Sequence, residues 1–342
     1  MLLSVPMIVK NEVDVLDECL ASVADVADEL LVLDTGSTDD TMDIARKYTP
    51  HVFASELFNA NTPPERFHFA DARNEILARC TGDWVFSIDA DESLIQTSLR
   101  DYLQRVMADG CNISLHTDKG GHPWGPRIFR NNGRIRWHRR VHETPQPLNE
   151  NQRISIPPEV AHIVHRRGVE RASTLERNLR LLQVQLRESQ RDNDCDGMMA
   201  AVAYMGDTYR AMGLYVEAIG CYHATIAGLI KPYNDIFRLY ILNLLADCYY
   251  HIGLMRAALQ YALESLVIEP NCYEGMLTAG AALGELGRPS EGLVYLRRAL
   301  DCDCPVRASF ADNLPDNTDW VRETIAKQEE ALRGRRAEGR NN

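Results

Sequence analysis

The acid-rich segment Asp89–Glu92 (Asp-Ala-Asp-Glu) has the clearest chemical potential in this sequence. It follows Trp84–Ile88, whose aromatic and β-branched residues predict a buried strand. Acids at the end of such a strand are costly to desolvate unless a cation or a ligand compensates them. Asp89 and Asp91 together can reach a hard divalent cation that also binds a diphosphate. Short acidic clusters also act as helix caps, so the interpretation depends on the motifs that accompany this one.

A second acid, Asp34, closes another predicted buried strand over Glu29–Leu33. In an open α/β sheet, ligands bind at the carboxyl ends of the strands, so we expect Asp34 to project from the strand tip toward a ligand. Gly36 permits a tight turn shortly after it. Three good N-cap residues then precede a helix predicted over Thr41–Tyr48: Ser37, Thr38 and Asp39.

The elements that must position these acids alternate between strands and helices. Leu2–Val9 is a short apolar run, and the apolar positions between Val15 and Val23 have the spacing of a helix face. Val52–Ala54 is a candidate third strand, and Phe69–Glu75 opens a helix that leads into the acidic strand. Strands that alternate with helices favour an α/β fold with a mostly parallel sheet.

Four motifs lie in the N-terminal half: Ile8–Glu12, Asp34–Thr41, Ala72–Asn74 and Asp89–Glu92. In their order and in their spacing, they resemble family 2 glycosyltransferases of the GT-A fold. The Lys-Asn-Glu opening is similar to the lipopolysaccharide-core glucosyltransferase branch and to bacterial peptide S-glycosyltransferases, which carry helical repeats after the catalytic domain. The resemblance covers about residues 1–170. Asp34-Thr35 replaces the commoner Asp-Asp pair, and the acceptor-side region is short.

This resemblance implies a role for each motif residue in binding a nucleotide-sugar donor. Asp34 would hydrogen-bond the nucleotide base, and Arg73 would lie near the base and the diphosphate. Asp89 would face the ribose or the sugar, while Asp91 would hold Mg²⁺ or Mn²⁺ on the two phosphates. The resemblance also implies donor binding by Lys10, Glu12 and Arg127.

The chemistry of the leaving group agrees with these roles. A nucleoside diphosphate leaves readily only when its developing charge is neutralised, which a metal ion and an arginine can do. Arg73 also has a simpler interpretation, as a surface helix charge paired with Asp71 or Glu75.

Asn132-Gly133 predicts a β-hairpin between Pro126–Arg130 and a strand that ends at Val141–Glu143. That ending is similar to a hydrophobic-His-Glu element of the same glycosyltransferase branch. Inverting sugar transfer needs a base that deprotonates the acceptor, and Glu143 is the candidate. The transition state would resemble an oxocarbenium ion. His142 would contact the metal or a phosphate. The alternative is a His-Glu pair packed beneath the hairpin.

Two further features of this region have two interpretations each. Trp137 would stack on a sugar or lie in the core. His165, with Arg166 and Arg167 after it, would line the diphosphate pocket or form a basic surface at a domain junction.

The C-terminal half has a different pattern, with a glycine in each of three successive predicted helix turns. Gly213 and Gly253 are 40 residues apart, and Gly253 and Gly287 are 34 apart. This period, with Ala and Gly at the expected helix contacts, resembles tetratricopeptide repeats. The glycines would tolerate positive φ. The longer interval implies an insertion around Lys231–Asn234.

These patterns predict a GT-A α/β domain over residues 1–170 and an all-α repeat domain over 171–332. Leu175–Leu186 would be a joining helix, Trp320–Leu332 a capping helix, and residues 333–342 a disordered tail. Such repeats usually hold a partner, which would be a peptide or a second copy of the chain in a homodimer.

Bulk composition narrows the class of protein. The 342 residues are enough for two cores, and a net charge of −12 argues against a nucleic-acid partner. The 9 cysteines include no Cys-x-x-Cys pair, which favours reduced thiols and a cytoplasmic location. We expect no signal peptide and no membrane span.

The sequence as a whole therefore predicts an inverting, metal-dependent glycosyltransferase. It would move a hexose from a nucleotide-diphosphate sugar, with UDP as the expected nucleotide, to a peptide or protein side chain or a saccharide. One alternative is a lipopolysaccharide or cell-surface glycan glucosyltransferase. Another is a repeat scaffold with a vestigial nucleotide-sugar site, against which the intact Asp89, Asp91 and Glu143 argue.

Overall fold

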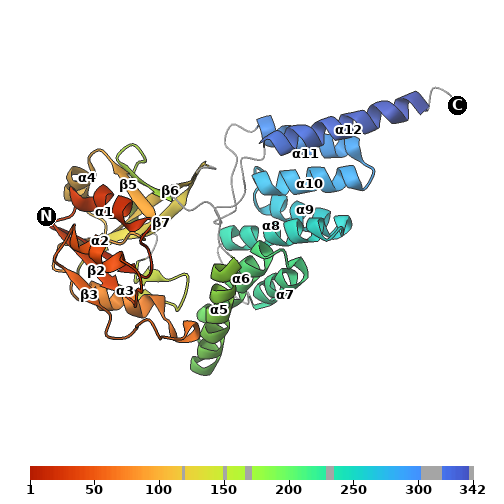
Figure 1. The fold of residues 1–342 in the computed structure, drawn as a ribbon. Helices are drawn as coiled ribbons and strands as arrows, with labels where there is room; N and C mark the ends of the chain where they lie inside the picture. The colour runs from red at the N-terminus through yellow and green to blue at the C-terminus, as the bar shows by residue number, and fades with distance from the viewer. Residues whose placement is uncertain (118–119, 149–151, 166–171, 229–234, 302–317, 339–342) are drawn as a thin grey trace. The chain divides into compact units, whose positions relative to one another are not determined.

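The computed structural model describes residues 1–342 except 118–119, 149–151, 166–171, 229–234, 302–317 and 339–342. Its contacts divide the chain into two compact units, Met1–Gln185 and Leu186–Asn342 (Figure 1). The division falls inside helix α5 (Ala172–Asp192), whereas the sequence placed the domain boundary at residue 170.

The first unit is built on a mixed sheet with the order β3-β2-β1-β4-β7-β6-β11-β5, and β10 pairs with β6 beside this path. β1, β2, β3 and β4 run parallel, as predicted, while β7 is antiparallel to both β4 and β6. The strands of this sheet are β1 (Leu3–Val9), β2 (Glu29–Asp34), β3 (Val52–Ala54), β4 (Trp84–Phe86), β5 (Glu92–Gln96), β6 (Gly110–Thr117), β7 (Gly120–Arg130), β10 (Arg153–Ser155) and β11 (Ala161–His165).

Helices cover both faces of the parallel part of this sheet, because its strands are apolar on both sides. Leu30 and Val32 pack in one core with α1, while Leu31 and Leu33 pack in another with α3. Continuous apolar runs of this kind are typical of buried parallel strands. The helices of the unit, besides a 3-10 turn at Pro64–Arg66, are α1 (Leu16–Ala24), α2 (Thr41–Arg46), α3 (Phe69–Leu77) and α4 (Leu99–Arg105).

The predicted hairpin at Asn132-Gly133 is wrong in its pairing. Gly133 does turn the chain, with a φ of +74°. However, β7 pairs with β4 and β6, whereas β8 (Arg136–His138) pairs with β9 (Thr144–Gln146) in a separate sheet. The pairing with β4 buries Ile128 and Phe129 almost completely, so burial in the main sheet outweighs the local hairpin signal.

The second unit consists of helix pairs, which confirms the predicted all-α repeat region. Each pair turns at one of the glycines singled out in the sequence, and all three glycines have positive φ: Gly213, Gly253 and Gly287. Small residues meet between helices, as predicted, with Ala246, Ala262 and Ala279 in one cluster. The pairs are α6 (Cys195–Ala211) with α7 (Tyr215–Gly228), α8 (Asp235–His251) with α9 (Met255–Ile268), and α10 (Tyr273–Glu285) with α11 (Pro289–Asp301).

The chain's last described helix, α12 (Thr318–Glu338), is longer than the predicted capping helix. It continues past Leu332 to Glu338, so the prediction of a disordered tail from residue 333 is wrong for that part of the segment. The predicted insertion at Lys231–Asn234 lies outside the described residues. Within the described part of the chain, no helix combines the length and the apolar character that a membrane crossing requires.

Candidate active site

The predicted acids Asp34, Asp89 and Asp91 lie at or after the ends of adjacent parallel strands. β1 pairs with β2 in a register that sets Val9 opposite Asp34, and β4 lies on the other side of β1. The carboxyl ends of β1, β2 and β4 therefore meet at one edge of the sheet, where ligands bind in open α/β folds. Lys10 is exposed at this edge, after the end of β1.

Asp34 lies in a tight turn that only glycine can complete. Its carboxylate accepts the backbone N–H of Gly36 and that of Ser37, each at 3.1 Å, and Asp34 is 4% exposed. Gly36 has a φ of +108°, and a Cβ there would lie 2.1 Å from the nitrogen of Ala60. The predicted need for glycine is confirmed. Base binding by Asp34 stays a prediction.

The Lys-Asn-Glu motif holds this turn from the end of β1. The Oδ1 of Asn11 accepts the N–H of Thr38 at 2.8 Å, and the N–H of Asn11 donates to Ser37 Oγ at 2.9 Å. Next along the chain, Glu12 donates its N–H to Thr41 Oγ1 at 2.8 Å. Two motifs that are separate in the sequence thus form one hydrogen-bonded loop pair.

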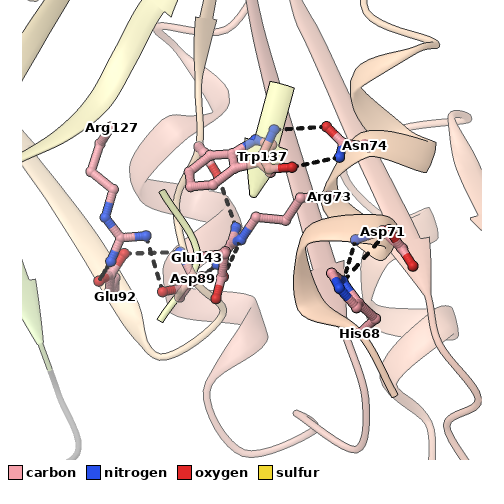
Figure 2. A network of polar contacts seen from close by, with 10 residues as sticks. His68, Asp71, Arg73, Asn74, Asp89, Glu92, Arg127, Trp137 and Glu143 are labelled. Atoms are coloured by element: carbon pink, nitrogen blue, oxygen red, sulfur yellow. Dashed lines mark hydrogen bonds and ion pairs between the residues drawn. The ribbon is translucent and has the colours of Figure 1, made fainter. Parts of the chain in front are cut away.

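Arg73 is the centre of the site (Figure 2). Its Nε donates to Glu143 Oε1 at 2.5 Å, its Nη1 to Ser87 Oγ at 2.8 Å and its Nη2 to Asp89 Oδ1 at 2.6 Å. The Arg73 side chain is 7% exposed, so these bonds lie largely away from water. The interpretation of Arg73 as a surface charge is wrong, because it joins the candidate base to the acidic motif.

Arg127 holds the same motif from the opposite side. It donates to the second oxygen of Asp89 at 3.1 Å and to Glu92 Oε1 at 2.8 Å (Figure 2). Burial opposes ionisation of Asp89, but Arg73 and Arg127 outweigh it and hold the pKa of that carboxyl well below its usual range. Both arginines implied by the resemblance therefore act on the acidic motif.

Glu92 is a member of this network to which the sequence analysis gave no role. Its Oε2 accepts the backbone N–H of Asp89 at 2.9 Å, and the residue is 2% exposed. Burial raises the pKa of Glu92 to about 7, against the opposing effect of Arg127. In the sequence, only its position directly after the Asp-Ala-Asp motif could have indicated that Glu92 belongs to the site.

Glu143 lies in a loop between β8 and β9 and not at a strand end. Its side chain is 11% exposed. Two residues of the loop, Arg139 and His142, have left-handed φ values of +80° and +52°. Such values are uncommon outside glycine and persist only when the surroundings hold them. Burial lowers the pKa of His142 to about 4, although Glu143 beside it acts in the opposite direction.

A bidentate contact fixes the strand that precedes this loop. Asn74 accepts the N–H of Trp137 and donates to its carbonyl oxygen, each at 2.9 Å (Figure 2). Trp137 is 6% exposed, and the Arg73 guanidinium lies 4.9 Å from its ring centroid. This confirms the core interpretation of Trp137. The Ala-Arg-Asn motif therefore holds both the side chain of Glu143 and the strand leading to it.

Asp91 faces His165, with its carboxylate 3.3 Å from His165 Nε2. The hydrogen bond to Asp91 raises the pKa of His165. Among the residues that the structure describes, no group of three or more His, Cys, Asp or Glu could hold a metal ion. The Asp91 carboxylate suits Mn²⁺ or Mg²⁺ when phosphate oxygens complete the coordination, whereas an imidazole is a better ligand for Mn²⁺ than for the harder Mg²⁺. Metal binding by His142 stays a prediction, and the sequence analysis gave His165 no role in it.

The structure thus brings together four of the predicted site residues: Arg73, Asp89, Arg127 and Glu143. It joins Asp91 to a residue predicted to line the diphosphate pocket, His165. The two arginines predicted beside that histidine, Arg166 and Arg167, lie outside the described residues.

Comparisons with known proteins show similar sequences among curated proteins. A TPR repeat-containing protein of Synechococcus elongatus is 39% identical over 146 residues, which cover 41% of this chain and 34% of that protein. The prophage-derived glycosyltransferase SunS of Bacillus subtilis is 32% identical over 154 residues, covering 42% of this chain and 35% of that protein. This chain spans about a third of the length of these curated relatives.

Among solved structures, residues 1–349 of S. aureus TarS in complex with UDP align with a TM-score of 0.40 and 14% identity, over 85% of this chain and 89% of that one. The family described as Glycosyl transferase family 2 matches residues 4–173, a range that contains every residue of the network around Arg73. The N-terminal part of this chain is therefore a family 2 glycosyltransferase domain.

Proposed function

We propose that the protein is an inverting hexosyltransferase that uses a nucleotide-diphosphate sugar, with UDP as the expected nucleotide. One observation carries the proposal. Arg73 joins the candidate base Glu143 to Asp89, so the acidic donor motif and the base share one buried cation at the carboxyl edge of the parallel strands. The family match and relatives that are named glycosyltransferases support the same reaction class.

In the proposed reaction, Glu143 accepts a proton from the acceptor as the acceptor attacks the anomeric carbon. The bond to the nucleotide diphosphate breaks on the opposite face of the sugar, and the configuration inverts. Arg73 holds one carboxylate oxygen of Glu143, which leaves the other to take the proton. Asp89 is held by two arginines in a single orientation, ready to accept hydrogen bonds from a ribose or a sugar.

Asp91 and His165 are the residues that we propose to hold Mn²⁺ or Mg²⁺. When bound, the cation supplies charge neutralisation to the diphosphate leaving group. Asp34, Glu12 and Lys10 lie at or beside the neighbouring turn, where we propose contacts with the nucleotide. The contact between Asn11 and Thr38 would keep that turn in place.

For the acceptor, we propose a peptide or protein side chain, with a saccharide as the alternative. Helical repeats commonly hold extended peptides on their surfaces. The relative in Synechococcus elongatus is named for such repeats, and SunS is named a glycosyltransferase. Both relatives match this chain over less than half of its length. The proposal of a peptide acceptor therefore depends on the helical repeats. A second copy of the chain is the other proposed occupant of the repeats, in a homodimer.

We also propose a reducing, cytoplasmic location. The cysteines in the described part of the chain are free thiols, and most of them lie inside helical or strand segments. Unpaired thiols of this kind are typical of reducing compartments.

The proposal is tested by release of UDP, and of other nucleotides, from a panel of nucleotide sugars in the presence of Mn²⁺, Mg²⁺ or EDTA. We expect slow, metal-dependent release from one donor. Glu143→Gln should lower release by a factor on the order of a hundred while nucleotide binding is retained. The matched control is Glu159→Gln, which changes an exposed glutamate of the same unit. If no donor is bound or cleaved, the scaffold alternative takes the place of this proposal.

A further inference from the structure

The loop that carries Glu143 is also held by a helix that lies mostly beyond the family match. α5 begins at Ala172, and the match ends at residue 173. From the middle of α5, Gln185 accepts the backbone N–H of Arg140 at 3.0 Å. Its Oε1 also lies 3.5 Å from the N–H of Val141. Both contacts are buried.

These two amides lie between the two left-handed residues of the loop, Arg139 and His142. A loop with two such residues depends on its surroundings for its conformation. One support is a backbone hydrogen bond, in which the carbonyl of Arg140 accepts the N–H of Phe69 at 2.9 Å. Gln185 is the side chain that receives the N–H groups of the central residues.

Within the described part of the chain, only the oxygen of the Gln185 side-chain amide makes hydrogen bonds. Gln185 is 5% exposed, and its Nε2 has no hydrogen-bond partner among the described residues. Its Oε1, by contrast, faces the two backbone donors. Burial of an unpaired amide nitrogen is unfavourable, so the contacts of Gln185 with the loop are made by its oxygen.

We propose that Gln185 is a positioning residue for Glu143. By accepting the amides of Arg140 and Val141 it fixes the backbone just before Glu143, and Arg73 then fixes the carboxylate. This inference rests on the proposed function for the role of Glu143 as the base. This role makes the first part of α5 belong to the catalytic unit. The division of the chain by its contacts agrees, because the first compact unit extends to Gln185.

The test uses three variants of the full chain. Gln185→Met keeps the length of the side chain and removes the acceptor oxygen. Gln185→Glu keeps an acceptor oxygen but replaces the nitrogen that has no partner with a second oxygen, which adds an ionisable group to a buried site. Gln190→Met is the matched control, because it makes the same substitution at an exposed position of the same helix.

Three quantities are measured for each variant: the rate of UDP release from the active donor, the affinity for UDP by calorimetry, and amide hydrogen exchange at residues 140–143. We expect Gln185→Met to lower the rate on the order of ten- to a hundredfold, because a displaced base loses its alignment with the acceptor. UDP affinity should stay within about twofold, since no donor contact changes. Exchange of the Arg140 and Val141 amides should become faster.

Gln185→Glu keeps the acceptor, so exchange of the Arg140 and Val141 amides should stay slower than in Gln185→Met. Gln190→Met should match the parent in all three measurements. The inference is overturned if Gln185→Met keeps the parent rate, if Gln185→Glu exchanges the Arg140 and Val141 amides as fast as Gln185→Met, or if UDP affinity falls in parallel with the rate. The last result would mean that Gln185 only maintains the fold.

A parent protein that releases UDP from no donor would reject the proposed function separately. In that case, hydrogen exchange still tests whether Gln185 holds the amides of Arg140 and Val141. Faster exchange at Arg140 and Val141 in Gln185→Met alone would show that Gln185 orders the loop, and unchanged exchange would refute that.

Discussion

Arg73 and Glu143, 70 positions apart in the chain, form a bond of 2.5 Å between Nε and Oε1. The same guanidinium reaches Asp89 through Nη2 at 2.6 Å. A planar guanidinium offers donors in several fixed directions, so it can align two carboxylates that belong to different loops. Lysine, with a single ammonium group, cannot reproduce this geometry.

We expect Arg73→Gln to destabilise the first unit by about 3 kcal/mol or more, because the buried Glu143 would lose its arginine partner and Asp89 would keep only Arg127. The measurement is the urea unfolding midpoint, followed by tryptophan fluorescence. Arg46→Gln is the control, since both side chains of the Arg46–Asp43 ion pair are exposed and its loss should cost less than about 1 kcal/mol. Equal effects of the two variants would contradict the role of Arg73.

Asp91→Asn should remove the dependence of UDP binding on Mn²⁺ or Mg²⁺, because an amide is a much weaker ligand for these cations than a carboxylate. His165→Gln should weaken the same dependence. Calorimetric titration of UDP with the metal and with EDTA measures both effects. Asp71→Asn serves as the control, because Asp71 is half exposed and pairs with His68. Parent-like, metal-dependent binding in Asp91→Asn would show that the metal assignment is wrong.

Gly36→Ala should destabilise the fold by more than about 3 kcal/mol, because a Cβ would collide with the backbone at Ala60 in a conformation already unfavourable for alanine. Gly133→Ala is the matched comparison. Gly133 also has positive φ, but a Cβ there meets no atom within 4 Å, so the cost should be about 1 kcal/mol. Thermal unfolding measures both. A similar loss for both variants would mean that φ alone, and not the contact with Ala60, sets the cost.

The stability of the helical unit should fall as pH rises through neutrality, because of His251. The hydrogen bond to Asp247 raises the pKa of His251, against the effects of burial and of Arg210, and its ring stacks on Tyr215. A raised pKa in the folded state means that the stabilisation is fully present below the unfolded value of 6.5 and is lost as pH rises through the folded value. His251 is 46% exposed, so the contribution should be below about 1 kcal/mol.

Thermal unfolding of the full chain between pH 5.5 and 8.5 (about one unit below and two above the ordinary histidine pKa) tests this expectation. His251→Gln should flatten that pH dependence. Tyr250, which contacts the same ring edge-on, has a pKa raised from 10.0 and does not titrate in this range. A slope unchanged by the substitution would assign the dependence to other groups.

Local patterns in the chain were sufficient to predict the strand that ends at Asp34, the strand before Asp89, the turn at Gly36 and the glycine turns of the helix pairs. These features depend on apolar runs, on glycine geometry and on helix period, which act over a few residues. The pairing of β7 was not predictable in this way. Asn132-Gly133 is a sound local hairpin signal, but the burial of Ile128 and Phe129 against β4 depends on residues far away in the sequence.

The contrast between local patterns and long-range packing also explains how the predicted site differs from the observed one. Asp89, Arg73 and Glu143 were recognisable from their motifs, yet nothing near Arg73 in the sequence indicates that it bonds to Glu143. Gln185 had no local signal at all, because a glutamine in an amphipathic helix looks like a surface residue until its neighbours are known. Residue type and short-range spacing specify which groups can do chemistry. Which of them meet is decided by long-range packing, because only the folded chain brings a helix, a strand end and a loop to one buried point.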